Sequence, residues 1–163
     1  MYNHNQLERI SRSITLLIEE ELKRCGIFFR IFYRCKTLES INGKISTKKY
    51  DGDTRFLRDA IGIRIAFYFR DDIDIIHPHL KNKFTYMEET IDKNSATEFK
   101  PTRLNIIFRI PSDYIIEFKE IVQNEKVDTS FEIQLRTVLS EGWHEVDHDM
   151  RYKCESDWAN YFE

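Results

Sequence analysis

The sequence predicts an α/β or α+β domain, in which helices pack against one β-sheet. Three observations support this fold class. The chain of 163 residues has the length of a single domain. Several short segments are rich in β-branched and aromatic residues, which favour strands. Other segments carry apolar residues at intervals of three and four, which is the pattern of amphipathic helices. We therefore expect residues 1–163 to form one domain without linkers or repeats.

The first half of the chain alternates between helices and strands. We expect an amphipathic helix, a strand, a short polar helix, a buried central strand and a second helix, at residues 5–24, 28–33, 37–48, 60–69 and 71 to about 80. Gly26 marks the end of the first helix. We expect residues 1–25 to form an N-terminal helix that packs against the rest of the domain. Asp71 and Asp72 look like the N-terminal cap of the last helix.

The second half is less regular. Residues 84–103 show no clean period, and residues 113–123 fit either a helix or a strand. Two strands are expected at 104–110, which Pro111 ends, and at 130–136, where polar and apolar residues alternate. A long helix follows, with Leu139, Trp143, Val146 and Met150 at core spacing over residues 137–153.

Composition excludes several classes of protein. The net charge of -3 and the pI of about 6.0 argue against a non-specific DNA-binding surface. The three cysteines are sparse and widely spaced, which argues against a disulfide framework and for a reducing compartment. The N-terminus lacks the apolar run of a signal peptide, and no apolar run approaches the ~18 residues of a membrane span. We therefore expect a cytoplasmic protein without a membrane partner.

The segment His144-Glu145-Val146-Asp147-His148 spells H-E-x-x-H, the helical motif of zinc proteases. That chemistry needs a third ligand, and one common form continues with Gly and His three and six residues further on. Arg151 and Cys154 occupy those positions here. The simpler interpretation is an ordinary helix with a solvated face.

Cationic side chains lie where a purely structural role is costly. Arg34 and Lys36 follow the strand at 28–33, and Lys44 is ten residues beyond Arg34. Arg64 lies within the most apolar strand, where a buried guanidinium needs a partner or a ligand. Arg gives planar bidentate contacts to phosphate, and Lys gives a point charge. These residues are candidate phosphate ligands, although each alone also fits an ordinary surface cation.

Acidic and amide side chains form a second candidate group. Glu132, Gln134 and Arg136 share one face of the strand at 130–136, so they line either a site or a solvated face. Asp59 stands directly before the strand at 60–69. On neighbouring strands, Asp59 and Glu132 could hold Mg²⁺, which takes one or two protein carboxylates together with phosphate oxygens.

Four motifs occur in order along the chain. They are RCKTLESINGK (34–44), RDAIGIRI (58–65), DDI (71–73) and FEIQLRT (131–137), the last followed by Trp143 and DHDMRYK (147–153). Together they resemble the RelA/SpoT family of alarmone synthetases, whose final pattern is like E-I-Q-[IL]-R-T, W, E-H-x-x-R-Y-K. The resemblance covers about residues 30–153 with a gap in the middle. Because the H-E-x-x-H spelling falls inside this pattern, we interpret it as accidental.

The resemblance implies a mixed β-sheet related to the nucleotidyltransferases. It also implies transfer of the β,γ-diphosphate of ATP to the 3′-hydroxyl of GDP or GTP, with release of AMP. In this reaction, positioning and charge neutralisation carry most of the catalysis. Asp59 would bind Mg²⁺, and Glu132 would assist it or act as the base. ATP and its phosphates would be held by Arg34, Lys36, Lys44 and Arg64. The acceptor, or the wall of its site, would involve Arg103, Gln134, Arg136 and His148.

The acceptor motif of the family is not matched. It resembles N-G-Y-R-S-x-H, and its tyrosine stacks on the acceptor guanine. Pro101, Thr102 and Asn105 occupy its Tyr, Arg and His positions here, and a proline cannot stack like a tyrosine ring. Candidate substitutes are Phe99, Arg103 and Tyr86.

The function therefore remains open between two hypotheses. The chain is a pyrophosphotransferase that uses GDP, GTP, another nucleotide or a tRNA 3′ end, as some toxin members of the family do. Alternatively, it is a catalytically degenerate module that binds nucleotide without turnover. The carboxylates Asp59 and Glu132 favour the enzyme, whereas the missing acceptor motif favours the degenerate module. A homo-oligomer is compatible with either hypothesis.

Overall fold

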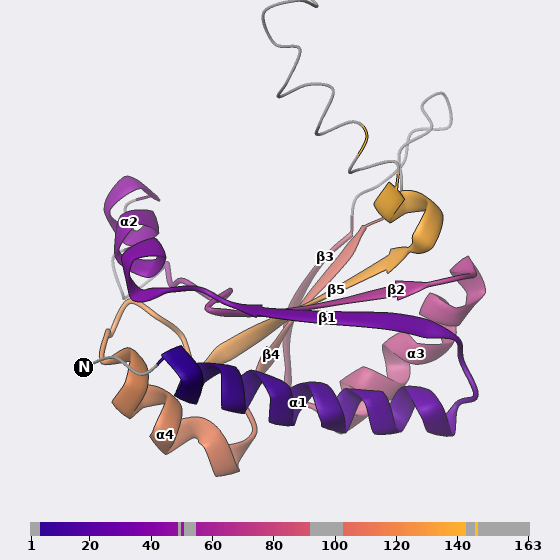
Figure 1. Cartoon of the computed structure of the whole chain (residues 1–163), viewed down its shortest axis with the longest axis horizontal. Coiled ribbons are helices and arrows are strands. Elements are labelled where there is room, and N and C mark those ends of the chain that lie inside the picture. Colours follow the sequence, from indigo (N-terminus) through magenta and orange to yellow (C-terminus); the bar gives the residue numbers. More distant parts are fainter. Residues whose placement is uncertain (1–3, 49, 51–54, 92–102, 143–145, 147–163) are drawn as a thin grey trace, which may run out of the picture.

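The computed structural model describes residues 4–48, 50, 55–91, 103–142 and 146. Its centre is a mixed sheet of five strands in the order β1-β2-β5-β4-β3 (Figure 1). The parallel pair is β2 with β5, and the other neighbours are antiparallel. The strands in chain order are β1 (Phe29–Cys35), β2 (Ile61–Phe67), β3 (Tyr86–Ile91), β4 (Leu104–Arg109) and β5 (Ser130–Thr137). The predicted fold class, helices around a mixed sheet, is confirmed.

Three helices cover one face of this sheet, and the fourth stands apart. The helices α1 (His4–Arg24), α3 (Arg70–Lys83) and α4 (Ser112–Val122) lie below the sheet in Figure 1. The helix α2 (Leu38–Lys48) rises from the end of β1 on the other side. We call the face that α1, α3 and α4 do not cover the open face.

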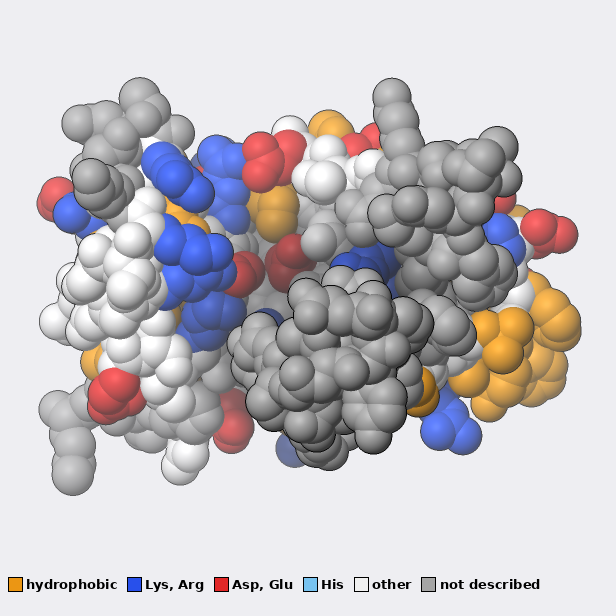
Figure 2. Space-filling model, turned by 90° about the horizontal axis from the view of Figure 1, so that it is seen from above, with side chains coloured by type: hydrophobic (Ala, Val, Ile, Leu, Met, Phe, Trp, Pro, Cys, Tyr) orange, Lys and Arg blue, Asp and Glu red, His pale blue; other side chains and the backbone are white. Residues whose placement is uncertain are grey.

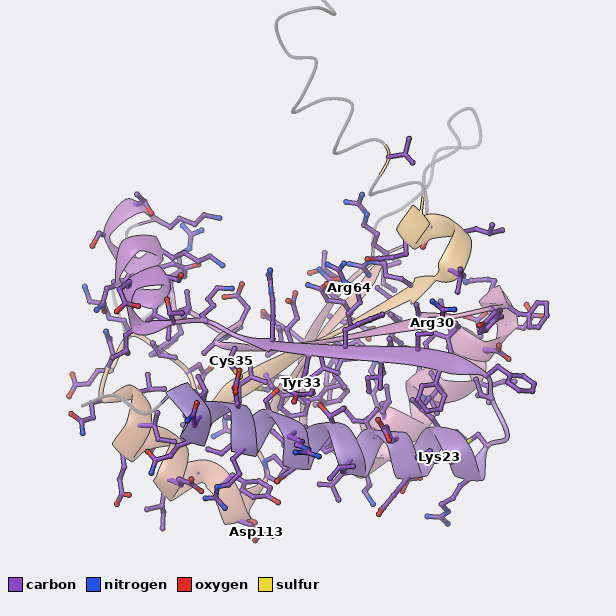
Figure 3. All side chains as sticks on the ribbon, in the orientation of Figure 1. Lys23, Arg30, Tyr33, Cys35, Arg64 and Asp113 are labelled. Atoms are coloured by element: carbon purple, nitrogen blue, oxygen red, sulfur yellow. The ribbon has the colours of Figure 1, made fainter. Side chains whose placement is uncertain are left out.

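The core forms because the strands turn alternate apolar residues toward these three helices. In β2, Ile61, Ile63 and Ile65 are fully buried, and they belong to the same cluster as Leu7 and Ile14 of α1. The edge strand β1 follows the same alternation, since Tyr33 and Cys35 point toward α1 (Figure 3). Residues between the core positions consequently face the opposite side of the sheet, where the candidate site lies.

The expected helix at 5–24 and the strands at 28–33, 60–69, 104–110 and 130–136 are confirmed, within a few residues at their ends. The polar segment at 37–48 is also a helix. The ambiguous segment at 113–123 is the helix α4, because its buried residues Phe118 and Val122 are four apart. The structure shows a helix from Val138 to Gly142 and again at Val146, and the rest of the expected long helix lies outside the described residues.

One local prediction is wrong. Asp71 and Asp72 do not cap α3: the helix begins at Arg70, Phe69 is the capping residue, and no side-chain cap hydrogen bond is present there. Both aspartates lie within the first turn, where negative charge favours the helix dipole. The strand β3 falls in the segment that shows no period. Its inward position Glu89 is a carboxylate rather than an apolar residue, which hides the alternation.

Glu89 is stabilised in that position by two partners on α3, Lys81 and His77. Its Oε2 lies 2.8 Å from Lys81 Nζ and 2.8 Å from His77 Nε2. The hydrogen bond from Lys81 is the largest influence on the pKa of Glu89 and holds it below its ordinary value. In the part of the chain that the structure describes, none of the helices has both the length and the apolar character required to cross a bilayer.

Candidate active site

The open face carries two adjacent rows of polar side chains. In β2 and β5, Gly62, Arg64, Glu132 and Gln134 alternate with buried residues and therefore face the open side. The register between strands places Gly62 beside both Arg34 of β1 and Glu132 of β5. It also places Arg64 beside Gln134. Residues predicted separately from three segments of the sequence therefore meet on one surface.

A carboxylate held by two lysines lies at one end of this surface. Oδ2 of Asp59 accepts a hydrogen bond from Lys44 Nζ at 2.6 Å and lies 3.1 Å from Lys36 Nζ. Burial would by itself raise the pKa of Asp59. The hydrogen bond from Lys44 and the charge of Lys36 outweigh burial and keep the pKa below its ordinary value of 3.8. Asp59 is thus ionised at neutral pH, and the cluster carries one positive charge in excess.

Local structure fixes the three members of this cluster. The backbone N–H of Lys36 donates to the carbonyl of Ala60 at 2.9 Å, which holds the end of β1 beside Asp59. Lys44 lies on α2, whose first turn is capped when Thr37 Oγ1 accepts from the backbone N–H of Ser40 at 3.3 Å. The buried side chain of Ile41 anchors α2 to the core. The lysines therefore converge because two separate elements are pinned next to the start of β2.

The lysine-held carboxylate forms part of a polar pocket. We call it the carboxylate pocket; its volume is about 310 Å³, and it also contains Glu132 on its wall. Its full lining is Lys44, Tyr50, Arg55, Phe56, Arg58, Asp59, Glu88 and Glu132. In Figure 2, Lys and Arg side chains gather around the end of the molecule that carries α2, with acidic side chains next to them. Anionic groups of a ligand would meet both signs of charge here.

The donor set of the carboxylate pocket fits Mg²⁺ chemically. Asp59 and Glu132 offer carboxylate oxygens, which are the ligands that Mg²⁺ prefers, and phosphate oxygens commonly complete its coordination. Among the described residues, no group of three or more His, Cys, Asp or Glu side chains could hold a metal ion. The protein would therefore supply two carboxylates at most, as is usual for Mg²⁺ bound with a phosphorylated substrate.

A chain of hydrogen bonds crosses the open face from Arg64. Arg64 Nε donates to Gln134 Oε1 at 3.1 Å, and Gln134 Nε2 donates to Glu132 Oε2 at 2.8 Å. The other side of the Arg64 guanidinium, Nη1, forms an ion pair with Oε1 of Glu141. These partners satisfy the guanidinium that appeared costly within an apolar strand. Figure 3 shows Arg64 on the face of the sheet opposite to α1.

A second pocket lies beside the carboxylate pocket, between two arginines. We call it the arginine pocket; its volume is about 350 Å³, and Arg34 and Arg64 contribute to its wall. Its lining is Phe32, Tyr33, Arg34, Gly62, Ile63, Arg64, Gln134 and Glu141. A Cβ added at Gly62 would lie 3.8 Å from Arg34 Cγ, which is an ordinary van der Waals contact, so the Arg34 side chain packs directly over Gly62. Arginine side chains stack well on planar aromatic rings, so this pocket suits a flat heterocycle.

Arg136 has a structural environment that differs from that of the other candidates. It is 7% exposed, and its guanidinium donates to the carbonyl oxygens of Leu104 and Leu135 at 3.3 and 2.8 Å and to Asn105 Oδ1 at 2.6 Å. Burial and then the positive charge of Arg103 lower the pKa of Arg136 to about 10. Arg136 thus ties β5 to β4 and holds the side chain of Asn105.

Sequence reasoning missed three participants in the site. Glu141 was unassigned, although it pairs with Arg64 across a long sequence separation. Glu88 lies in the segment without a period, and it pairs with Arg58 at 2.6 Å in the wall of the carboxylate pocket. Asp128 is the second partner of Arg58, at 3.3 Å. Glu88 could have been predicted only if β3 had been recognised as a strand. The alternation of polar and apolar residues that would reveal β3 is hidden by Glu89.

Several sequence predictions fall on residues that the structure does not describe. They are His148 as a site residue, Pro101 and Thr102 of the acceptor segment, and the histidines of the H-E-x-x-H spelling. These remain predictions. Of the other candidates, Arg34, Lys36, Lys44, Asp59, Arg64, Glu132 and Gln134 line the two pockets or contact a residue that does.

Comparison with solved structures gives the fold of alarmone synthetases. Small alarmone synthetase 1 from Bacillus subtilis, bound to its product pppGpp, matches with a TM-score of 0.57 and 22% identity over 94% of this chain and 83% of that chain. Small alarmone synthetase 2 from the same organism matches with 0.58 and 18% over 95% and 82%. A GTP pyrophosphokinase family protein from Streptococcus pneumoniae matches with 0.59 and 20% over 93% and 75%.

Comparison with curated proteins gave no match. The family model described as "Region found in RelA / SpoT proteins" matches residues 33–157, which is most of the chain and includes the lining of both pockets except Phe32. The motifs that carry the resemblance lie within that range, and the sheet brings together those that lie on β1, β2 and β5. The chain therefore belongs to the RelA/SpoT family.

Proposed function

We propose that this protein is a pyrophosphotransferase that moves the β,γ-diphosphate of ATP to the 3′-hydroxyl of a nucleotide acceptor. One observation carries the proposal. Asp59, held by Lys36 and Lys44, shares a pocket with Glu132, and an arginine-lined pocket adjoins it. A site for phosphoryl-type transfer needs cations for phosphates and carboxylates for a metal, and these groups supply both.

The two pockets suggest how ATP would lie. The adenine ring would enter the arginine pocket between Arg34 and Arg64, where guanidinium planes can stack on it. The triphosphate would then extend toward Lys36 and Lys44, which already point at Asp59. Phosphate oxygens would take over part of the lysine hydrogen bonds. That exchange would leave the Asp59 carboxylate available to a metal ion that enters with the nucleotide.

The proposed reaction breaks a phosphoanhydride bond of ATP and forms a phosphoester bond on the acceptor. The 3′-oxygen of the acceptor attacks the β-phosphorus of ATP, and the bond from that phosphorus to the oxygen bridging the α-phosphate breaks. AMP leaves with the bridging oxygen, and the diphosphate remains on the acceptor. The proton of the attacking hydroxyl passes to the carboxylate of Glu132. Gln134, which donates to Glu132 Oε2 at 2.8 Å, keeps that carboxylate oriented.

Mg²⁺ is the cofactor that we propose for this site. Asp59, with Glu132 as a second carboxylate, would hold it in the carboxylate pocket. When bound, the ion neutralises charge on the phosphates and orients them for in-line displacement. Lys36, Lys44 and Arg34 add to that neutralisation from the protein side. The cytoplasm is the location that we propose for this activity.

The acceptor is proposed to be GDP or GTP, as in the family, with another nucleotide or a tRNA 3′ end as the alternatives. The solved relative from Bacillus subtilis bound to pppGpp supports a guanine nucleotide. The sequence of the acceptor segment, with Pro101 where the family has tyrosine, favours the alternatives or a degenerate nucleotide-binding module. Asn105 lies in the described part of this segment, and its side-chain oxygen accepts a hydrogen bond from Arg136.

The test is the release of AMP from ATP with Mg²⁺, measured separately with GDP, GTP, ADP, ATP and bulk tRNA. We expect AMP with at least one acceptor, in a one-to-one ratio with the diphosphorylated product. Glu132→Gln should lose about 100-fold or more in turnover, because it removes the base while keeping its shape. If the protein binds ATP but releases no AMP with any acceptor, the hypothesis of an enzyme is refuted in favour of the degenerate nucleotide-binding module.

A further inference from the structure

Four side chains form an unbroken chain between the two pockets. Glu141 pairs with Nη1 of Arg64, Arg64 Nε donates to Gln134 at 3.1 Å, and Gln134 donates to Glu132 at 2.8 Å. The first three belong to the arginine pocket, and the last belongs to the carboxylate pocket. A disturbance at Glu141 therefore has a physical route to the carboxylate that we assign to the chemistry.

The chemistry of the groups fixes the direction of this chain. A guanidinium only donates hydrogen bonds, so Gln134 must present its carbonyl oxygen to Arg64. Its amide nitrogen must then point to the other side, where Glu132 accepts from it. Without Arg64 as donor, the Gln134 amide could turn over and direct its oxygen at Glu132. The position of Arg64 thus determines which face of Gln134 the carboxylate of Glu132 meets.

Glu141 lies in a short helical segment whose start is capped by hydrogen bonds. It follows β5 in the helical segment that begins at Val138. Thr137 and Ser140 cap this segment reciprocally: Ser140 Oγ accepts from the backbone N–H of Thr137 at 3.0 Å, and Thr137 Oγ1 accepts from that of Ser140 at 3.1 Å. The carboxylate is half-buried, and its Oε2 is buried without a hydrogen-bond partner among the residues that the structure describes. Such a group is costly, so a role for its charge beyond packing would explain its presence.

We infer that Glu141 is a positioning residue: it fixes the Arg64 guanidinium in the wall of the arginine pocket and, through Gln134, orients the Glu132 carboxylate. This inference rests on the proposed function. Through this chain of hydrogen bonds, binding of a ligand in the arginine pocket would affect the orientation of Glu132 in the carboxylate pocket. A nucleotide base that engages Arg64 would consolidate the whole chain before transfer begins.

The experiment is a double-mutant cycle on the full chain. Glu141→Gln keeps the shape and removes the charge, and Gln134→Met keeps the length and removes both hydrogen bonds. The control is Glu117→Gln, which removes another Arg–Glu pair, with Arg9, between α1 and α4 on the covered face. Binding is measured with α,β-methylene ATP, whose scissile bridge cannot be transferred. Turnover is measured as AMP release, with kcat and KM for ATP determined separately.

We expect Glu141→Gln to lower kcat about 10- to 100-fold, the usual cost of removing a group that orients a reacting one. It should also weaken binding of α,β-methylene ATP about tenfold. The double variant should be no worse than the more impaired single variant, because both act through Arg64 and Glu132. Glu117→Gln should match the wild type. If Glu141→Gln does not fold, Glu141→Asp, which shortens but keeps the charge, takes its place in the cycle.

Either of two results would overturn the inference while the proposed function stands. Glu141→Gln with wild-type kcat, KM and analogue affinity would assign Glu141 to packing alone. Losses that multiply in the double variant would show that Glu141 and Gln134 act separately. A wild-type protein that binds the analogue without releasing AMP would refute the proposed transfer. The inference about Glu141 would then be tested by the double-mutant cycle measured on the affinity for α,β-methylene ATP. A wild-type protein that does not bind the analogue would refute both.

Discussion

Replacing Asp59 by asparagine removes one negative charge from between two ammonium groups at 2.6 and 3.1 Å. At an effective dielectric constant of about 20, each ammonium attracts the carboxylate by roughly 5–6 kcal/mol, and desolvation offsets most of this. Breaking a fully buried ion pair costs about 3–5 kcal/mol, and breaking a surface pair costs about 0–1 kcal/mol. Asp59 is 24% exposed, so its pairs lie between these two cases. We expect Asp59→Asn to lower the free energy of unfolding by about 2 kcal/mol.

Chemical denaturation at pH 7 measures this difference, and it corresponds to a drop of about 4–8 °C in Tm. The effect should depend on pH. Because the folded-state pKa of Asp59 lies below its ordinary value of 3.8, the stabilisation is present above that value and is lost as pH falls through the folded-state pKa. The stabilities of the variant and the wild type should therefore converge in acid. A constant difference between them at all pH values would refute this account of Asp59.

Glu89→Gln is the matched control for turnover. Glu89 is also 24% exposed and also has two side-chain partners, Lys81 and His77, but it faces α3 on the covered side of the sheet. Both variants should lose comparable stability, whereas only Asp59→Asn should lose turnover, by about 100-fold or more. Equal losses of AMP release in the two variants at 25 °C would show that damaged folding, and not the site, explains the loss.

Three further predictions concern the pockets and their support. Lys44→Met should weaken α,β-methylene ATP binding about 10- to 100-fold in calorimetry, because a charge-assisted contact to phosphate is lost; unchanged affinity would remove Lys44 from the phosphate site. Gly62→Ala should bind normally, since its Cβ would make an ordinary contact with Arg34, whereas Gly62→Leu should fill the arginine pocket and abolish binding without unfolding the protein. Arg136→Met should lower stability by about 2–3 kcal/mol in urea, because Asn105 and two backbone carbonyls lose their donor; a loss below about 0.5 kcal/mol would contradict the structural role.

The parts of the fold that could be predicted are those whose burial is one-sided. In β2 every buried position is apolar, and in α1 only Ser11 and Thr15 interrupt the buried apolar residues, so the period is visible in the sequence. In β3 the inward position Glu89 is satisfied by His77 and Lys81 from another element, and no local pattern records that compensation. The start of α3 was misjudged for a related reason. Asp71 is a good capping residue by type, yet the chain enters the helix two residues earlier, at Phe69.

The candidate site divides in the same way. Arg34, Lys36, Asp59 and Glu132 could be named because their positions beside strands follow from the order of the motifs. Which of these side chains pair with one another could not be predicted, because pairing depends on which strands adjoin. The parallel pairing of β2 with β5 sets Arg64 beside Gln134 and within reach of Glu141, which lies far along the chain. Such contacts arise from tertiary structure and leave no local sequence signal.

The most direct test of the proposed chemistry follows the β-phosphate of ATP. With ATP labelled at the β-phosphorus, Mg²⁺ and the acceptor that supports AMP release, the label should move to the acceptor in step with AMP. The Asp59→Asn and Glu132→Gln variants should slow the transfer of label, and Glu89→Gln should not. Label recovered as free pyrophosphate or retained in ADP, with none on any acceptor, would contradict the assignment of this site to diphosphate transfer.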